Sequence, residues 1–294
     1  MMKNNFALIG ASGYIAPKHT EAIQKCGGKL LLYTDPHDNV GYLDKYYPEA
    51  KYFKEIERFD RELTRMSFSE SKIDYVSICS PNYLHDSHMR LGLRNGANVI
   101  CEKPLVIKYD HLEMLQELEK KYDKKVYTIL QLRLHPSIIS LKKKISESDA
   151  KHKVKLNYIT PRGKWYDFSW KGSFDKSGGL LFNIGIHFFD MLIWIFGDPI
   201  DFEIVKTSSS SKGKLFLEKA EVDFFLSVDK DDLPHKEWKP FRSISVDEEE
   251  LEFSEGFTEL HNKSYSNILG GHGFGINEVK KTIHLIEKMS KNER

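Results

Sequence analysis

Apolar and polar stretches alternate in a regular order along the first 131 residues. Helical patterns, with an apolar position every three or four residues, lie between short apolar runs. Such nearly continuous runs suit strands that are buried on both faces. The alternation predicts a parallel sheet with helices on both sides. The predicted strands are 6–9, 29–34, 50–53, 74–79, 98–101 and 126–131, and the predicted helices are 14–25, 56–68, 85–95 and 108–121.

The remainder of the chain has a different pattern. Strand-like runs occur at 153–160 and 200–228, and 242–253 is predicted to form a hairpin around the acidic turn DEEE. Three helices are predicted among them, at 181–196, 257–269 and 276–290. We therefore expect an α/β protein of two domains. The first is a Rossmann-type, parallel-sheet, NAD-binding domain (1–127), and the second is an α+β domain with a mostly antiparallel open sheet, for substrate binding and oligomerisation (128–294).

Composition narrows the possible partners. The 294 residues are 40% hydrophobic and 30% charged, with a formal net charge of +1, so a large core is expected and a global basic field is not. We expect no nucleic-acid or membrane partner, because no apolar run approaches the roughly 20 residues that span a bilayer. An odd count of three cysteines, without the features of a signal peptide, predicts reduced thiols and a cytoplasmic location.

A dinucleotide signal follows the first predicted strand. Gly10, Gly13 and Ala16 form the loose fingerprint G-x-x-G-x-x-A, which permits a tight turn, close approach of a pyrophosphate, and close helix packing. Glycine at such a turn also has purely structural uses. Asp35, which ends the second strand, can hold ribose hydroxyls and would repel a 2′-phosphate, so we expect NAD rather than NADP. The alternative for Asp35 is a simple turn acid.

Two other predicted strands end in polar residues. These ends are Ser80-Pro81-Asn82 and Glu102-Lys103-Pro104. Ligands of open α/β sheets bind outside the carboxyl ends of the strands, and Pro104 restricts Lys103 to an extended backbone. We therefore expect Lys103 to reach the nicotinamide end of the cofactor, with an ordinary ion pair to Glu102 or another acid as the alternative.

A polar stripe marks the apolar helix predicted at 181–196. Asn183, His187 and Asp190 have the spacing of one helical face, and polar groups on such a helix must find partners or line a cavity. A metal site is not expected, because no further ligands stand out and the chain lacks HExxH and CxxC motifs. His187 is instead predicted to be a catalytic or a structural histidine.

The stretches GASGYIAPKH, SICSPNYLH, CEKPL and GGLLFNIGIHFFDMLIWIFG together resemble the glucose-fructose oxidoreductase/inositol dehydrogenase (Gfo/Idh/MocA) family. Within it, ILQLR, ITPRGKWY and EFSEGFT are similar to UDP-N-acetyl-2-amino-2-deoxyglucuronate dehydrogenases of bacterial O-antigen (lipopolysaccharide) synthesis. The resemblance implies a homotetramer and NAD-dependent oxidation of the sugar C3 hydroxyl of UDP-N-acetylglucosaminuronate to a ketone. It also implies that NADH is recycled by 2-oxoglutarate.

The resemblance also assigns residues to roles. It implies His187 as the base that takes the hydroxyl proton and Lys103 as its electrostatic partner, and the reverse assignment stays open. Many family members have Asp where this chain has Asn183, so Asn183 is expected to bind substrate. The expected cofactor-binding residues are Gly10, Ser12, Gly13, Tyr14, Ile15, Asp35, Ser80, Pro81, Asn82, His85, Glu102, Lys103 and Gln131.

Cations and aromatic residues complete the expected substrate site. Arg133, Arg162 and Lys164 are candidates for the uronate and pyrophosphate. The aromatic candidates for uracil or sugar, which could equally pack an oligomer interface, are Trp165, Tyr166 and Trp170. Two other functions stay open. One is a family dehydrogenase for another sugar or a cyclitol, and the other is a non-catalytic sensor module that binds NAD(H).

Overall fold

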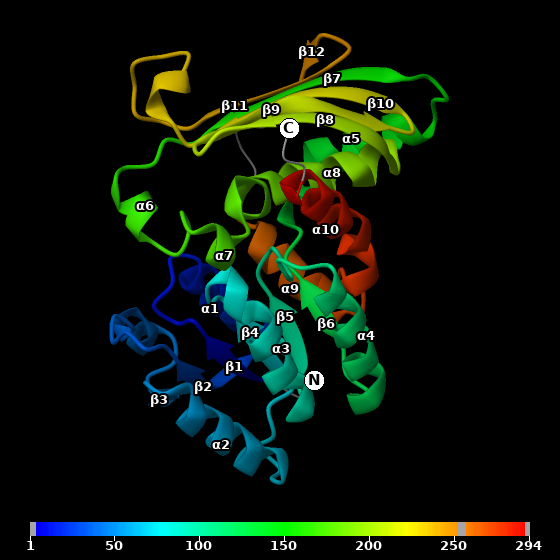
Figure 1. Cartoon of the computed structure of the whole chain (residues 1–294). Coiled ribbons are helices and arrows are strands. Elements are labelled where there is room, and N and C mark those ends of the chain that lie inside the picture. Colours follow the sequence, from blue (N-terminus) through cyan, green and yellow to red (C-terminus); the bar gives the residue numbers. More distant parts are fainter. Residues whose placement is uncertain (1–3, 252–256, 292–294) are drawn as a thin grey trace. The chain divides into compact units, whose positions relative to one another are not determined.

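The computed structural model describes residues 4–251 and 257–291, and the chain divides into two compact units (Figure 1). Unit 1 consists of Met1–Ile129 and Thr258–Glu278, and unit 2 of Leu130–Phe257 and Val279–Arg294. The sequence prediction assigned the whole of 128–294 to the second domain, so the placement of Thr258–Glu278 differs. The reason is packing, because Tyr265 and Ile268 of this segment are buried in the same core as Phe6 and Leu8.

Unit 1 contains the predicted parallel sheet. Its strand order is β3-β2-β1-β4-β5-β6, and every neighbouring pair runs parallel. Helices lie on both faces, and the strands are accordingly buried along most of their length (Figure 1). The strands are β1 (Asn5–Ile9), β2 (Lys29–Thr34), β3 (Lys51–Phe53), β4 (Tyr75–Ile78), β5 (Asn98–Cys101) and β6 (Val126–Thr128).

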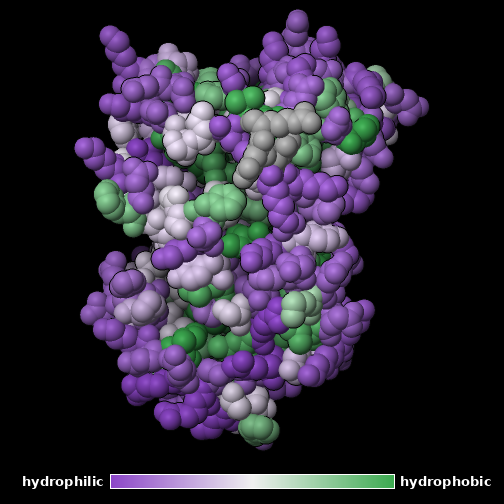
Figure 2. Space-filling model, viewed as in Figure 1, coloured by the Kyte–Doolittle hydropathy of each residue, from purple (hydrophilic) through white to green (hydrophobic). Residues whose placement is uncertain are grey.

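The helices of unit 1 follow the predicted pattern, with one addition from the end of the chain. Pro17 lies in the first turn of α1, where its missing N–H costs nothing. Figure 2 shows hydrophilic residues over most of the visible face of this unit. The helices are α1 (Ala16–Lys25), η1 (Gly41–Lys45), α2 (Ile56–Ser67), η2 (Asn82–Leu84), α3 (His85–Arg94), α4 (Asp110–Tyr122) and α9 (Leu260–Leu269), and α10 (Ile276–Lys291) begins here and continues into unit 2.

Unit 2 contains the predicted, mostly antiparallel sheet. Its order is β12-β11-β7-β10-β9-β8, in which β7 and β10 are parallel and the other pairs antiparallel. Residues 252 and 253 of the predicted hairpin lie outside the described residues. The strands are β7 (His152–Ile159), β8 (Pro199–Lys206), β9 (Ser210–Leu217), β10 (Ala220–Ser227), β11 (Phe241–Val246) and β12 (Glu249–Glu250).

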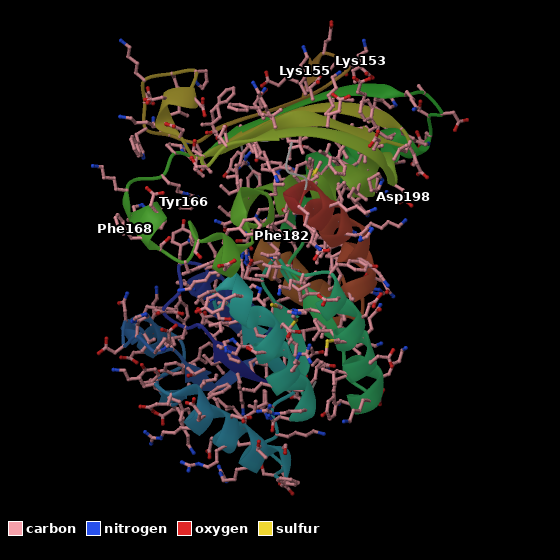
Figure 3. The ribbon with its side chains drawn as sticks, in the orientation of Figure 1. Lys153, Lys155, Tyr166, Phe168, Phe182 and Asp198 are labelled. Atoms are coloured by element: carbon pink, nitrogen blue, oxygen red, sulfur yellow. The ribbon has the colours of Figure 1, made fainter. Side chains whose placement is uncertain are left out.

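Helices cover one face of this sheet. Val154 and Leu156 of β7 are buried, whereas Lys153 and Lys155 project from the face opposite α5 and α8 (Figures 1 and 3). This alternation is expected of a strand with one covered face. Besides the part of α10 given above, the helices of unit 2 are η3 (Gln131–Leu134), α5 (Pro136–Ser146), α6 (Trp165–Phe168), α7 (Phe174–Ser177), η4 (Leu181–Gly185), α8 (Ile186–Phe196) and η5 (Lys230–Asp232).

Two sequence predictions about apolar segments need correction: the strand at 126–131, and the expectation that no apolar run approaches the roughly 20 residues that span a bilayer. The strand predicted at 126–131 ends at Thr128, and Gln131 begins a 3-10 turn in unit 2. Phe174–Phe196 has 23 residues and a mean hydropathy of 1.7, which by length and composition alone would suffice to cross a membrane. Because 72% of its apolar window is buried within the protein, it is typical of a core helix in a globular domain.

Candidate active site

The turn between β1 and α1 has the backbone that a dinucleotide site requires. Gly10 has φ +85°, and a Cβ on it would lie 2.5 Å from the Ser80 nitrogen. A Cβ on Gly13 would lie 3.1 Å from the Gly10 oxygen, and Ala16 is fully buried where α1 begins. Small residues thus let the backbone come close to the carboxyl ends of the strands, and these features fit a bound pyrophosphate.

Asp35 lies beside this turn. It is 5% exposed, and its two carboxylate oxygens accept backbone hydrogen bonds from Ser12 (2.9 Å) and His37 (2.9 Å). These bonds fix the carboxylate next to the glycine turn, as expected for an acid that meets the ribose. Of the other predicted residues in the turn, Tyr14 is 93% exposed and Ile15 is half-buried.

His85 joins the loops that follow β4 and β5. Its Nε2 lies 2.8 Å from the Ser80 carbonyl oxygen, and its Nδ1 lies 2.7 Å from the Pro104 carbonyl oxygen. Burial lowers the pKa of His85, while the two carbonyl oxygens act in the opposite direction. The structure therefore brings the two predicted strand ends together through this buried ring. Pro81 and Asn82 lie at the start of η2.

Glu102 and Lys103 follow β5 directly, and the Lys103–Pro104 peptide is cis. Glu102 is 8% exposed, and its Oε2 accepts a hydrogen bond from the Lys103 backbone nitrogen (3.3 Å). Its Oε1 lies 2.9 Å from His19 Nε2 and 3.0 Å from His261 Nε2. Burial raises the pKa of Glu102, but the hydrogen bonds from the two histidines outweigh it and hold that pKa well below its ordinary value.

More buried polar groups extend this cluster. His19 Nδ1 lies 2.7 Å from the Tyr265 hydroxyl, which lies 2.7 Å from Ser77 Oγ. Burial lowers the pKa of His19 and raises that of Tyr265 well above its usual range. We call Ser77, Tyr265, His19, Glu102 and His261 the Glu102 network.

In unit 2, the helical stripe predicted from Asn183, His187 and Asp190 is divided by burial. Asn183 and His187 are half-buried, whereas Asp190 is 2% exposed. Leu181–Gly185 is π-helical, a conformation that often occurs at functional sites. Asn183 Nδ2 donates to the Tyr166 hydroxyl at 3.3 Å. Asn183 and Tyr166, both predicted for the substrate, are thus in contact.

Arg133 forms an ion pair with Asp190, which the sequence did not predict. Its Nε and Nη2 donate to the two carboxylate oxygens of Asp190, at 2.8 and 2.7 Å. The side chains are only 5% and 3% exposed, and Thr282 Oγ1 donates to Asp190 Oδ1 at 3.3 Å. This bidentate, buried pair gives Arg133 a structural role in unit 2, whatever it does for substrate.

The other predicted cations and aromatic residues surround α6. Arg162 and Lys164 are exposed, and Trp165 is 52% exposed. Lys171, which the sequence analysis missed, has its Nζ 5.9 Å from the Trp165 ring centre and 5.7 Å from that of Trp170. Burial, followed by the positive charge of Arg162, lowers the pKa of Lys171. The region therefore combines cations with aromatic faces, and Figure 3 labels Tyr166 and Phe168 within it.

Comparison with known proteins identifies the chain. The model of the GFO_IDH_MocA oxidoreductase family, NAD-binding Rossmann fold, matches residues 4–129, and that of the family's C-terminal alpha/beta domain matches residues 150–229. The chain belongs to this oxidoreductase family. The predicted NAD-binding Rossmann domain is thereby confirmed, and the glycine turn beside Asp35 fits it.

Solved structures from Thermus thermophilus resemble almost the whole chain. The WlbA (WbpB) dehydrogenase has been solved in complex with NAD and alpha-ketoglutarate, and also with NAD and UDP-GlcNAcA. In both cases the identity is 44% and the TM-score 0.95, over 99% of this chain and 96% or 95% of the other.

Curated relatives match over shorter regions. The D-glucoside 3-dehydrogenase of Escherichia coli (strain K12) is 27% identical over 44% of this chain and 37% of its own length. The first curated matches span 37–58% of those relatives.

Proposed function

We propose that this protein oxidises the C3 hydroxyl of UDP-N-acetylglucosaminuronate to a ketone, with NAD as the oxidant. The observation that carries the proposal is the 44% identity, over 99% of the chain, with a dehydrogenase solved in complex with NAD and UDP-GlcNAcA. The glycine turn, Asp35, Lys103 and His187 supply the residue types that the reaction needs. A role in O-antigen sugar synthesis follows as part of the same proposal.

The chemistry requires removal of a proton and a hydride from the sugar. NAD, when bound, accepts the hydride from C3. His187 is the proposed base for the hydroxyl proton, a role that typically contributes about 10²–10⁴-fold. The ammonium of Lys103 is the proposed group that stabilises the developing alkoxide.

The anionic parts of the substrate require cations. We propose that Arg162, Lys164 and Lys171 bind the uronate and pyrophosphate. The side chains of Arg162 and Lys164 are exposed. The ammonium of Lys171 lies over the rings of Trp165 and Trp170. Arg133 already shares two N–H donors with Asp190. We therefore propose that Arg133 stabilises unit 2 rather than binding the substrate directly.

Recycling of the cofactor by 2-oxoglutarate belongs to the proposal. Its support is the complex of the similar Thermus protein with alpha-ketoglutarate. In this step the ketone of 2-oxoglutarate takes up the hydride and a proton and becomes a secondary alcohol, which restores the oxidised cofactor.

Absorbance in the NADH band tests both reactions. The purified protein is mixed with UDP-N-acetylglucosaminuronate, first without added cofactor and then with excess NAD. We expect a rise in absorbance that 2-oxoglutarate reverses. No rise under either condition, in a protein that binds NAD, would reject the proposed substrate.

Two variants test the roles of Lys103 and His187. We expect His187→Ala and Lys103→Ala each to lower kcat by about 10²–10⁴-fold while NAD still binds. His235→Ala, at an exposed histidine of unit 2, serves as the control. Wild-type turnover in both active-site variants would remove these residues from the mechanism.

A further inference from the structure

The Glu102 network draws its members from segments that are far apart in the sequence. His19 lies on α1, Ser77 on β4, and Glu102 at the end of β5, whereas His261 and Tyr265 lie on α9. Their side chains are all buried, and α9 packs against α1. The network thus connects a late helix to the residue that precedes Lys103.

The hydrogen-bond directions in the network can be assigned from its chemistry. An ionised carboxylate only accepts, so His19 and His261 must both donate their Nε2–H groups to Glu102 Oε1. With its Nε2 protonated, a neutral His19 accepts the Tyr265 O–H at Nδ1, and Ser77 O–H then donates to the Tyr265 oxygen. In this arrangement His19 is neutral and each contact pairs one donor with one acceptor.

Glu102 connects this network to the backbone of Lys103. It precedes Lys103 in the chain, and its second oxygen accepts the Lys103 backbone N–H at 3.3 Å. We propose that His19, His261 and Tyr265 are positioning residues, which hold Glu102 ionised and fixed and thereby set the backbone that carries Lys103. The inference rests on the proposed function only for the role of Lys103.

The same three groups also have the composition of a metal site. The ligand atoms of His19, Glu102 and His261 all lie within 4.8 Å of one another. However, two tetrahedral ligand atoms that each lie about 2.0–2.1 Å from a metal are about 3.3 Å apart. The separations of 2.9 and 3.0 Å are those of hydrogen bonds, so the inference commits to protons and not to a metal ion.

Variants at position 261 test the positioning role. His261→Leu removes the donor, His261→Gln retains an N–H donor of similar reach, and His272→Leu, at an exposed histidine after α9, is the control. We expect His261→Leu to lower kcat about 10- to 100-fold while the KM for NAD changes less than about threefold. His261→Gln should recover kcat to within about threefold of wild type.

Tyr265→Phe is a milder second variant, which removes one hydroxyl and keeps the buried ring. We expect it to lower kcat about threefold to tenfold, again without a matching change in the KM for NAD. Wild-type kcat in both His261→Leu and Tyr265→Phe would overturn the inference. So would a loss in His261→Leu that His261→Gln does not restore, because then shape and not the donor matters.

Measurements on the wild-type protein separate this inference from the substrate proposal. Nitrogen-15 NMR of the histidine rings at pH 7 should show protons on Nε2 of His19 and His261 and none on Nδ1 of His19. Metal analysis should find no stoichiometric zinc. A proton on His19 Nδ1, or one zinc per chain that dialysis does not remove, would overturn the network as described. Neither result depends on which sugar the protein oxidises.

Discussion

Glu102 in unit 1 and Asp190 in unit 2 are both buried carboxylates, but they are stabilised by different donors. Imidazole N–H groups of His19 and His261 hold Glu102, whereas the guanidinium of Arg133 holds Asp190 through two parallel bonds. A guanidinium carries its charge at any pH that a protein tolerates, and an imidazole does not. The Asp190 pair is therefore a fixed structural link, while the Glu102 network depends on where its protons lie.

The largest expected effect comes from Asp190→Asn. The amide leaves the buried guanidinium of Arg133 without a counter-charge, which typically costs about 3–5 kcal/mol in the free energy of unfolding. All four tryptophans of the chain lie in unit 2, and the Arg133 guanidinium lies 5.7 Å from the Trp194 ring centre. Urea unfolding followed by tryptophan fluorescence therefore measures the loss in the relevant unit.

A double variant controls for this experiment. Arg133→Met combined with Asp190→Leu removes both charges together, so most of the loss should be recovered. If the free energy of unfolding of Asp190→Asn is within about 1 kcal/mol of the wild-type value, the pair is not a fixed structural link.

The next effect concerns pH and His88 of unit 1. His88 Nδ1 lies 2.9 Å from Ser80 Oγ, and burial, followed by the charge of His85, lowers the pKa of His88 to about 4. The unfolded chain takes up a proton near pH 6.5 and the folded chain only near pH 4. Folding stability from this group is thus complete above pH 6.5 and falls as the pH drops towards 4, by about 2 kcal/mol at pH 5.

His88→Asn isolates this contribution. Asparagine can still bond to Ser80 but does not titrate, so the variant should lose about 2 kcal/mol less than wild type between pH 7.5 and pH 5. Hydrogen exchange of peptides from α3 reports on unit 1, which contains no tryptophan. Equal losses in both proteins would show that His88 is not kept neutral by the fold.

Glu102→Gln is the matched counterpart of Asp190→Asn, and we expect a smaller effect on stability. The amide oxygen still accepts from the two imidazoles, no permanent charge is left unpaired, and only the bond from the Lys103 backbone N–H is lost, so the expected cost is about 1 kcal/mol. Hydrogen exchange of β5 peptides measures it. A cost as large as that of Asp190→Asn would mean that at least one of the two histidines is charged at neutral pH.

The features that could be predicted from the sequence are those formed by residues close together in the chain. The glycine turn, Asp35 and the polar ends of β4 and β5 follow from residues within one strand–turn–helix unit, and the alternating patterns predicted both sheets. The π-helical turn at Leu181–Gly185 has no sequence signal of this kind, because its residues are equally compatible with an α-helix.

Pairings across long sequence separations could not be predicted in this way. Glu102 meets His261 across 159 positions, and His19 meets Tyr265 across 246. Arg133 was a candidate for the substrate because a uronate and a pyrophosphate need cations and arginine suits bidentate carboxylate binding. Nothing in the pattern linked it to Asp190. The weak signals that existed were His19 and His261, which lie on mostly apolar helix faces.

The smallest expected effect comes from an exposed pair in unit 2 that has the same kinds of charge as Arg133 and Asp190. Lys281 Nζ lies 2.5 and 2.6 Å from the carboxylate oxygens of Asp198, but the side chains are 59% and 48% exposed. Solvent already stabilises both charges, so we expect Lys281→Met to change the free energy of unfolding by less than about 1 kcal/mol. Tryptophan fluorescence again provides the measurement. A loss comparable to that of Asp190→Asn would show that ion pairing itself, and not burial of the unpaired charge, determines the cost in this unit.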